Sequence, residues 1–446
     1  MVELKDVIIE ADYLVSCNER DQVIKDAAVY ISKSNIVAVG TKKEIEKNYS
    51  ASQIIDGKNK ILIPGLVNTH SHSVQTLLRG QADDLALLDW LKTVVLPGEA
   101  RFTADEVYSS SLLGFAEMIR TGTTSTNDML TTHNTEKGIQ AAIDIGIRTR
   151  IGKMLMDVNN AFPEIIKEDT ETIIETVTKQ IEKYHGYDNQ RIKYSLNARF
   201  LLSCSKKLMK LIVETQNKYP DLMIHTHASE SQEECKEVKK IYGKSYIRAL
   251  KEVSALGSET ILAHGIWLDD EEYKLVKETS TRITHNPSSN CKLASGICDV
   301  IKYHEHGVIV GIGTDGPPCN NNFDMFTDMR LATFLQKVKY LNERVLPARK
   351  VLRMATIEGS AALNWQKTIG SIEVGKKADL VLVDVNNVNS LPLYDPTSHL
   401  VYAASGKDVS LTMIDGKIVY QDGAYKTFDF EKLKKNVVSY QNKRIE

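Results

Sequence analysis

Two histidines separated by one residue follow an apolar stretch early in the chain. The segment "PGLVNTHSHSVQ" contains them as His70 and His72. In an extended chain, side chains two residues apart point the same way, so both imidazoles can bind one metal ion. The same spacing also arises where polar residues follow a turn. The pair therefore predicts a metal site only if the rest of the chain supplies further ligands at matching places.

Other residues with metal-binding or acid–base side chains stand where further strands are expected to end. His227 and Glu230 lie in "HTHASE", His264 lies in "LAHG" and Asp315 lies in "GIGTDG". A lone histidine at such a place is usually an ordinary polar residue, but several at matching strand ends are hard to explain by chance. Neutral imidazoles with one carboxylate suit a borderline divalent cation such as zinc, with a coordination position left for water. We therefore interpret the His-x-His pair as a ligand pair.

The middle of the chain alternates short β-branched runs with long helical patterns. Such alternation favours a parallel sheet with crossover helices. The expected strands cover residues 61–67, 122–128, 147–155, 191–197, 222–227, 260–264, 281–285 and 308–315, and the clearest helices cover 104–120, 169–184 and 323–338. Eight repeats indicate an α/β fold closed into a (β/α)8 TIM-like barrel, in which functional residues gather at the carboxyl ends of the strands. An open doubly wound sheet is the alternative.

The two ends of the chain have a different sequence pattern, in which short strands are separated by turns rich in Asp, Asn and Gly. Neither end has enough strands to bury a core alone, so we expect the two ends to build one small composite β-sandwich domain. The predicted division assigns residues 1–60 and 366–446 to this domain and residues 61–365 to the barrel.

The composition argues against several functional classes. The chain of 446 residues has 56 Lys and Arg against 58 Asp and Glu, which gives no electrostatic case for binding nucleic acid or an anionic membrane. No apolar stretch approaches the ~20 residues that a membrane span needs, and the N-terminal residues are acidic where a secretory signal is basic. Six scattered cysteines without a C-x-x-C spacing indicate reduced thiols. We expect a cytoplasmic protein that acts on a small molecule and forms a homodimer or a higher homo-oligomer.

An ordered set of motifs runs through most of the chain, from about residue 5 to about residue 425. It consists of "PGLVNTHSH", "RGQADDLALLDWL", "LPGEARFT", "HTHASE", "THNPSSNCKLASG", "GTDGPPCNNNFDMF" and "GSIEVGKKADLVLVD". This set strongly resembles the amidohydrolase superfamily, in the branch that holds guanine deaminase, methylthioadenosine/S-adenosylhomocysteine deaminase and the triazine hydrolases. The resemblance implies a metal-bearing barrel with a small β-sandwich built from both termini.

The resemblance also implies roles for individual residues. It identifies one divalent metal ion, zinc with iron(II) as the alternative, held by His70, His72, His227 and Asp315. His264 is expected to be a further ligand or a donor to the substrate, and Glu230 is expected to carry protons. His225 shares a face with His227, but the H-x-x-E spacing of the family selects His227 as the ligand. His225 is then expected to be an interior strand residue.

The expected chemistry is hydrolytic deamination, which makes the protein a hydrolase of carbon–nitrogen bonds in cyclic amidines. A bound cation lowers the pKa of a water molecule towards ~7, so that hydroxide is available at neutral pH. Asp315 would accept a proton from this water, and Glu230 would protonate a ring nitrogen and later help ammonia to leave. From another class comes the alternative that the barrel is catalytically silent and serves as a binding module; intact ligands argue against it.

The substrate is less clearly indicated. Arg199 and Phe200 follow the fourth expected strand, where a fork of donors and a stacking face suit a flat oxo-amino ring. These residues, Gln75 and the segment 152–164 resemble guanine deaminase, so guanine or a related pterin is the first choice. The runner-up is deamination of methylthioadenosine or S-adenosylhomocysteine. The segments "LLRGQADDL" and "TDGPPCNNNFDMFTDMR" resemble the deaminases that act on these two nucleosides. Glu99 could hold ribose hydroxyls but occurs in both groups. Hydrolysis of a triazine is a third, less favoured reading.

Overall fold

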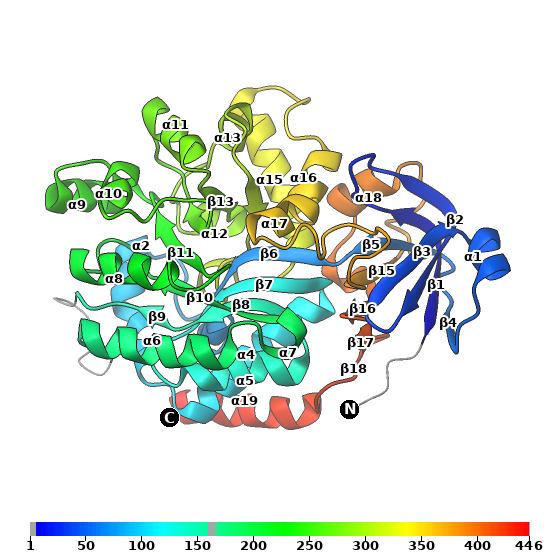
Figure 1. The fold of residues 1–446 in the computed structure, drawn as a ribbon, viewed down its shortest axis with the longest axis horizontal. Helices are drawn as coiled ribbons and strands as arrows, with labels where there is room; N and C mark the ends of the chain where they lie inside the picture. Colours follow the sequence, from blue (N-terminus) through cyan, green and yellow to red (C-terminus); the bar gives the residue numbers. More distant parts are fainter. Residues whose placement is uncertain (1–5, 159–165, 167, 446) are drawn as a thin grey trace.

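The computed structural model describes residues 6–158, 166 and 168–445 of the chain. Two sheets organise these residues, and they lie side by side in the long direction of the molecule (Figure 1). One is a parallel barrel surrounded by helices, and the other is a mixed sheet whose strands come from both ends of the chain. Within the described residues, no helix combines the length and apolar character that crossing a bilayer would require.

The barrel has eight parallel strands, which confirms the predicted fold class. Its strands are β6 (Leu66–Ser71), β7 (Thr123–Met129), β8 (Arg148–Gly152), β10 (Ile192–Ala198), β11 (Met223–Ala228), β12 (Thr260–His264), β13 (Arg282–His285) and β14 (Val310–Ile312), with the short β9 (Met154–Leu155) extending β8 along β10. The pairing of β14 with β6 and of β10 with β11 closes the ring. Closure excludes the open doubly wound sheet.

One expected strand proves to be two strands in different sheets. The apolar run at residues 61–67 is divided at Gly65 into β5 (Lys60–Pro64), which belongs to the mixed sheet, and β6, which opens the barrel. A Cβ atom at Gly65 would collide with the Thr124 side chain, so only glycine fits where the chain passes from one sheet to the other. The first barrel strand therefore begins later than the hydrophobic run suggests.

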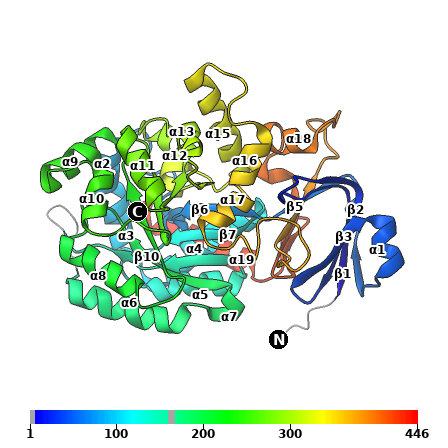
Figure 2. The same cartoon turned by 45° about the horizontal axis from the view of Figure 1, so that its top comes forward.

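Helices cover the outside of the barrel (Figure 2). Several of them begin with a side chain that caps the first turn. The expected helices 104–120, 169–184 and 323–338 correspond to α4 (Ala104–Arg120), α6 (Thr170–Tyr184) and α15 (Met325–Tyr340). Thr103 accepts a hydrogen bond from the Glu106 amide at the start of α4, and Asp169 accepts one from the Thr172 amide at the start of α6. The remaining barrel helices are α5 (Thr135–Ile145), α7 (Tyr187–Gln190), α8 (Lys206–Gln216), α9 (Gln232–Tyr242), α10 (Tyr246–Glu252), α11 (Asp270–Glu278), α12 (Pro287–Lys292), α13 (Val300–Glu305), α14 (Pro317–Asn320), α16 (Ala348–Met354) and α17 (Ile357–Ala362).

A long connection after β6 folds into short helices above the carboxyl ends of the strands. It contains the 3₁₀ helix η1 (Ser73–Leu78), α2 (Leu87–Trp90), the π-helix η2 (Leu91–Val95) and α3 (Leu96–Ala100). The buried side chains of α2, η2 and α3 join an apolar cluster that also includes Phe200 and Leu293. This connection therefore places apolar side chains over the mouth of the barrel.

The mixed sheet confirms that the two ends of the chain fold together. Its nine strands are β18 (Ala424–Tyr425), β17 (Lys417–Gln421), β16 (Val409–Ile414), β15 (Leu380–Asp384), β5, β1 (Val7–Val15), β2 (Val23–Ser32) and β3 (Asn35–Thr41), with β4 (Gln53–Ile55) beside β1. Helices α1 (Lys42–Asn48), α18 (Pro396–Tyr402) and α19 (Phe430–Ile445) belong to the same terminal segments, and α19 packs along α4 of the barrel (Figure 1). The domain limits at residues 60/61 and 365/366 stay predictions, with β5 contributing residues on both sides of the first limit to the mixed sheet.

A buried ion pair joins the barrel to the mixed sheet. Arg148 on β8 donates from Nε and Nη2 to the two carboxylate oxygens of Asp379, at 2.7 and 3.0 Å. Both side chains are about 1% exposed. The Asp415 backbone amide also donates to Asp379, at 2.8 Å. Because the aspartates flank strands of the mixed sheet, this cluster fixes the position of one sheet against the other.

Candidate metal centre and active site

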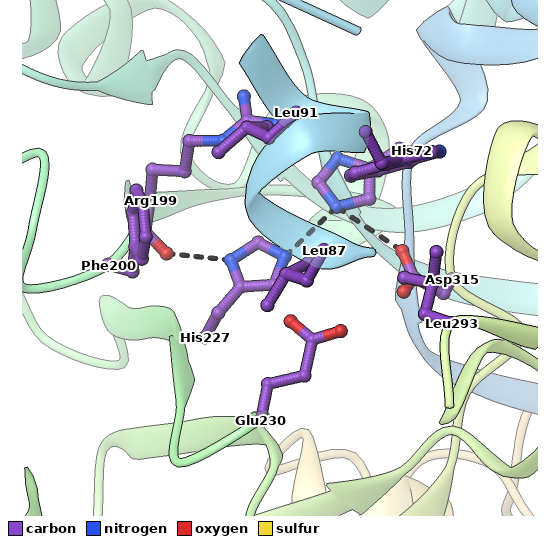
Figure 3. Close-up of a pocket in the computed structure, with 10 residues that line it drawn as sticks. His72, Leu87, Leu91, Arg199, Phe200, His227, Glu230, Leu293 and Asp315 are labelled. Carbon is purple, nitrogen blue, oxygen red and sulfur yellow. Dashed lines mark hydrogen bonds and ion pairs between the residues drawn. The ribbon is translucent and has the colours of Figure 1, made fainter. Parts of the chain in front are cut away.

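The four residues expected to bind a metal ion come together at the carboxyl ends of three barrel strands. His70 and His72 lie at the end of β6, His227 lies on β11 and Asp315 follows β14. One donor atom from each lies within 4.8 Å of the other three. In Figure 3 the side chains of His72, His227 and Asp315 surround a common space. The structure thus brings together residues separated by up to 245 positions in the sequence.

The donor atoms face one another closely. Nε2 of His72 lies 3.2 Å from Nε2 of His227, and Oδ1 of Asp315 lies 3.3 Å from Nε2 of His70 and 3.5 Å from Nε2 of His72. The remaining nitrogen of His227, Nδ1, donates to the backbone carbonyl of Arg199 at 2.6 Å. A carbonyl can only accept, so the proton of His227 lies on Nδ1 and the lone pair of Nε2 points at the cluster.

Burial sets the charge of these residues. It lowers the pKa of His70, and it lowers the pKa values of His72 and His227 well below the usual value for histidine. Burial would raise the pKa of Asp315, but the neighbouring His70 and His264 imidazoles hold this pKa well below its usual range. Neutral imidazoles and an ionised carboxylate are the forms in which these groups bind a divalent cation. The donor set therefore fits the metal ion that the motifs imply, and the four residues form a His/His/His/Asp metal site.

Glu230 and His264 lie beside this cluster. Oε2 of Glu230 is 3.5 Å from Nε2 of His264, which in turn is 3.7 Å from Oδ2 of Asp315. The Ser295 hydroxyl donates to Oε1 of Glu230 at 3.3 Å. Burial raises the pKa of Glu230 well above its usual value, and the Asp315 carboxylate acts in the same direction. Burial therefore favours the protonated form of this carboxyl group, which can pass a proton to a bound molecule.

Two residues of the cluster have strained backbone conformations. The backbone φ angle is 74° at His264 and 60° at Asp315, in the left-handed region that residues other than glycine rarely adopt. Asn290 Oδ1 lies 2.7 Å from Nδ1 of His264, while the Ser289 hydroxyl and the Gly316 amide each donate to Asp315 at 2.7 Å. Hydrogen bonds on both residues hold the strained turns in place, as is common where side chains must point at a functional site.

A cavity opens directly onto the cluster. It has a volume of about 410 Å³, and its polar lining consists of His72, Arg199, His227, Glu230 and Asp315. Its apolar lining comes from the connection after β6 and from the loops after β10 and β13, as Leu87, Trp90, Leu91, Phe200 and Leu293. The cavity has the largely apolar lining with a few polar groups that small-molecule sites usually have.

Three residues expected to touch the substrate contact one another beside the cavity. Gln75 donates from Nε2 to Oε1 of Glu99 at 2.7 Å, and Nη1 of Arg199 lies 3.5 Å from Oε2 of Glu99. All three are buried, but only Arg199 belongs to the cavity lining. Gln75 and Glu99 are bonded to each other, and Arg199 and Phe200 stand at the cavity wall; contacts of these four residues with a substrate stay predictions. The segment 152–164 lies partly outside the described residues.

The sequence reading missed a carboxylate that supports the His-x-His turn. Asp128, at the end of β7, accepts hydrogen bonds from the Ser71 hydroxyl at 2.6 Å and from the Ser73 amide and hydroxyl at 2.8 Å. The two serines flank His72, so Asp128 fixes the turn that aims this imidazole. An aspartate at the end of an expected barrel strand was the signal that could have identified it.

Comparisons with known proteins agree with this architecture. Residues 61–419 match the amidohydrolase family. A 5'-deoxyadenosine deaminase of Methanosphaera stadtmanae is 40% identical over 92% of this chain and 95% of its own length. A 5-methylthioadenosine/S-adenosylhomocysteine deaminase of Syntrophus aciditrophicus is 35% identical over 98% of this chain and 97% of its own. The crystal structure of an adenosine deaminase from Xanthomonas campestris with bound zinc superposes with a TM-score of 0.93 at 30% identity, covering 98% of both chains. With the predicted barrel and metal site confirmed, the chain belongs to the amidohydrolase family and is a metal-dependent deaminase.

Proposed function

We propose that this protein hydrolyses the exocyclic amino group of an adenine nucleoside modified at its 5' position, releasing ammonia. The observation that carries this proposal is the 40% identity with a 5'-deoxyadenosine deaminase over almost the whole of both chains. Guanine was the first choice from the sequence, but the relatives reported above favour the alternative, an adenosine analogue. Gln75, one of the residues on which the guanine reading depended, is bonded to Glu99 and is not part of the cavity lining.

The metal site and its neighbours supply the groups that this reaction needs. Zinc is the proposed ion, because three imidazoles and a carboxylate suit it, and when bound it makes water acidic enough to yield hydroxide at neutral pH. Asp315 is proposed to take a proton from the attacking water. Glu230 is proposed to protonate a ring nitrogen of adenine and then to help the amino group leave as ammonia. His264, beside both carboxyl groups, is proposed to orient the water and the substrate.

The base and the sugar have candidate partners on the cavity wall. Phe200 offers an aromatic face on which a purine can stack. Nη1 of Arg199 is buried and has no hydrogen-bond partner within the described part of the chain, so it can donate to an acceptor on the base or the sugar. Glu99 can reach ribose hydroxyls only if its contacts with Gln75 and Arg199 rearrange on binding.

The apolar wall favours a substrate whose 5' group is uncharged. Among the described residues that line the cavity, Arg199 is the only one with a permanent positive charge, and the Glu99 carboxylate 3.5 Å away balances that charge. Burying the ammonium and carboxylate of S-adenosylhomocysteine without partners would oppose binding. A methyl or methylthio group would instead gain from burial against leucine, tryptophan and phenylalanine side chains. We therefore propose 5'-deoxyadenosine and 5'-methylthioadenosine as the best substrates.

A panel of substrates tests the proposal through ammonia release. We expect kcat/KM for 5'-deoxyadenosine or 5'-methylthioadenosine to exceed that for S-adenosylhomocysteine by roughly tenfold or more, since burying its two charged groups without partners costs well over the ~1.4 kcal/mol that a tenfold change represents. Guanine should be turned over much more slowly than either. A higher kcat/KM for guanine than for every nucleoside would contradict the proposal, and equal values for S-adenosylhomocysteine would contradict the role of the apolar wall.

A further inference from the structure

His225 is a buried histidine whose role neither the motif nor the proposed reaction explains. It lies on β11 two residues before His227, so its side chain also points into the barrel. Its side chain is inaccessible to solvent. Nε2 of His225 lies 2.8 Å from Nδ1 of His70, and the two rings are nearly perpendicular at 88°. Its other nitrogen, Nδ1, has no hydrogen-bond partner among the described residues.

The position of the protons follows from what His70 must do. Nε2 of His70 faces Asp315 and the metal site, so this nitrogen needs its lone pair free to bind a cation. A neutral imidazole has one N–H, which must then lie on Nδ1 of His70. Nδ1 therefore donates to Nε2 of His225, and the proton of His225 lies on its own Nδ1. This arrangement assigns one tautomer to each ring without any charged group.

We propose that His225 is a positioning residue of the metal site, which holds His70 in the tautomer and orientation needed to bind the cation. Ligand histidines usually donate their second N–H to a carboxylate, a carbonyl or water, and loss of that acceptor weakens metal binding. Here an imidazole nitrogen takes that place. His227 uses the Arg199 carbonyl in the same way, so both acceptors are neutral and Asp315 remains the charged group of the ligand set.

A pair of isosteric substitutions tests this hydrogen bond. The side-chain amide of glutamine reaches the position of a histidine Nε2, whereas that of asparagine is one methylene too short. We expect His225→Gln to keep the dissociation constant for Zn²⁺ within about threefold of the unmodified protein, and His225→Asn and His225→Leu to raise it by about 10–100-fold. The constant is measured by competition with a chelator, in the absence of any substrate. The result therefore stands or falls independently of which nucleoside is deaminated.

His285 provides a matched control. It is another wholly buried histidine of the barrel, at the end of β13, and neither of its ring nitrogens has a hydrogen-bond partner among the described residues. His285→Leu also replaces a buried imidazole with leucine, but it leaves the hydrogen bond of His70 intact. This variant should therefore keep the dissociation constant for Zn²⁺ of the unmodified protein. Thermal unfolding of the metal-free variants, followed by circular dichroism, shows which of them fold.

The outcomes separate a hydrogen-bonding role from a merely structural one. Retained affinity in His225→Gln with weakened binding in His225→Asn supports the proposal. Equal affinities in these two variants overturn it, whether both match the unmodified protein or both fall together. If His225→Leu does not fold, the comparison between glutamine and asparagine still decides, because both are polar and differ by a single methylene.

Discussion

Glu230 shows at the scale of one residue how surroundings assign a chemical role. Its carboxyl group is almost fully buried, contacts His264 and Ser295 and lines the cavity next to the metal site. Burial favours the protonated form, and a protonated carboxyl beside a substrate cavity can act as a general acid. The neighbouring Glu233 on α9 is exposed and faces no such site.

Replacing Glu230 with glutamine tests its proposed part in proton transfer. Glu230→Gln keeps the size and hydrogen-bonding capacity of the side chain but cannot exchange a proton. We expect kcat for ammonia release to fall by about 10²–10⁴-fold, because general acid–base catalysis typically contributes that much, while the metal content stays unchanged. Glu233→Gln is the matched control and should keep the full rate. Turnover near the unmodified level in Glu230→Gln would show that another group moves the proton.

Single residues were predictable where a motif and a strand end coincided. His70, His72, His227, His264, Glu230 and Asp315 all stand at the carboxyl ends of barrel strands, so the rule for functional residues in barrels found them together. Asp128 also stands at such an end but binds two serines rather than metal, and that contact depends on a turn that no local pattern specifies. The hydrogen bond of 2.7 Å between Gln75 and Glu99 was not predictable, because it depends on how two separate segments pack; contact of Gln75 with the substrate stays a prediction.

At the scale of elements, boundaries with strong local signals were predicted well and boundaries set by distant contacts were not. Helix α4 begins and ends at the expected residues because Thr103 and Glu106 form a capping box. The single strand expected at residues 61–67 is two strands in the structure. Its first part, β5, pairs with β15, which lies more than 300 residues later. Apolar periodicity carries no information about that partner. The π-helix η2 could not be predicted either, since its sequence is typical of an ordinary α-helix.

The ion pair between Arg148 and Asp379 leads to a prediction about how elements are held together. Asp379→Ala leaves the Arg148 charge buried without its main partner, which should lower the free energy of unfolding by about 3–5 kcal/mol. Urea denaturation measures this change. The double substitution of Arg148→Met with Asp379→Leu should recover part of the loss, because no charge is then left buried.

An exposed pair serves as the control for this experiment. Lys179 and Glu175 on α6 are paired at 2.6 Å, but their side chains are about 70% exposed. Glu175→Ala should leave the denaturation midpoint unchanged, because solvent screens such pairs. An equally small effect in Asp379→Ala would mean that the ion pair does not hold the two sheets together.

At the scale of the whole molecule, the sheet built from both ends of the chain was predicted from the short strands and turn residues that the two ends share. The mixed sheet joins β1 to β5 from the beginning of the chain with β15 to β18 from the end, as Figure 1 shows. The barrel in between brings its strand ends to one mouth, where the connection after β6 adds an apolar wall. The substrate was harder to predict, since it depends on how cavity residues pair with one another rather than on which residues are present.

The barrel brings His70, His72, His227 and Asp315 together as a metal site. We propose that one divalent cation bound there is required for deamination. The most direct test measures metal content and ammonia release from 5'-deoxyadenosine together, before and after stripping with a chelator and after adding zinc back. We predict one divalent ion per chain, loss of activity with the ion, and recovery with zinc. Protein shown by atomic emission to be free of metal, yet deaminating at its original rate, would contradict the account.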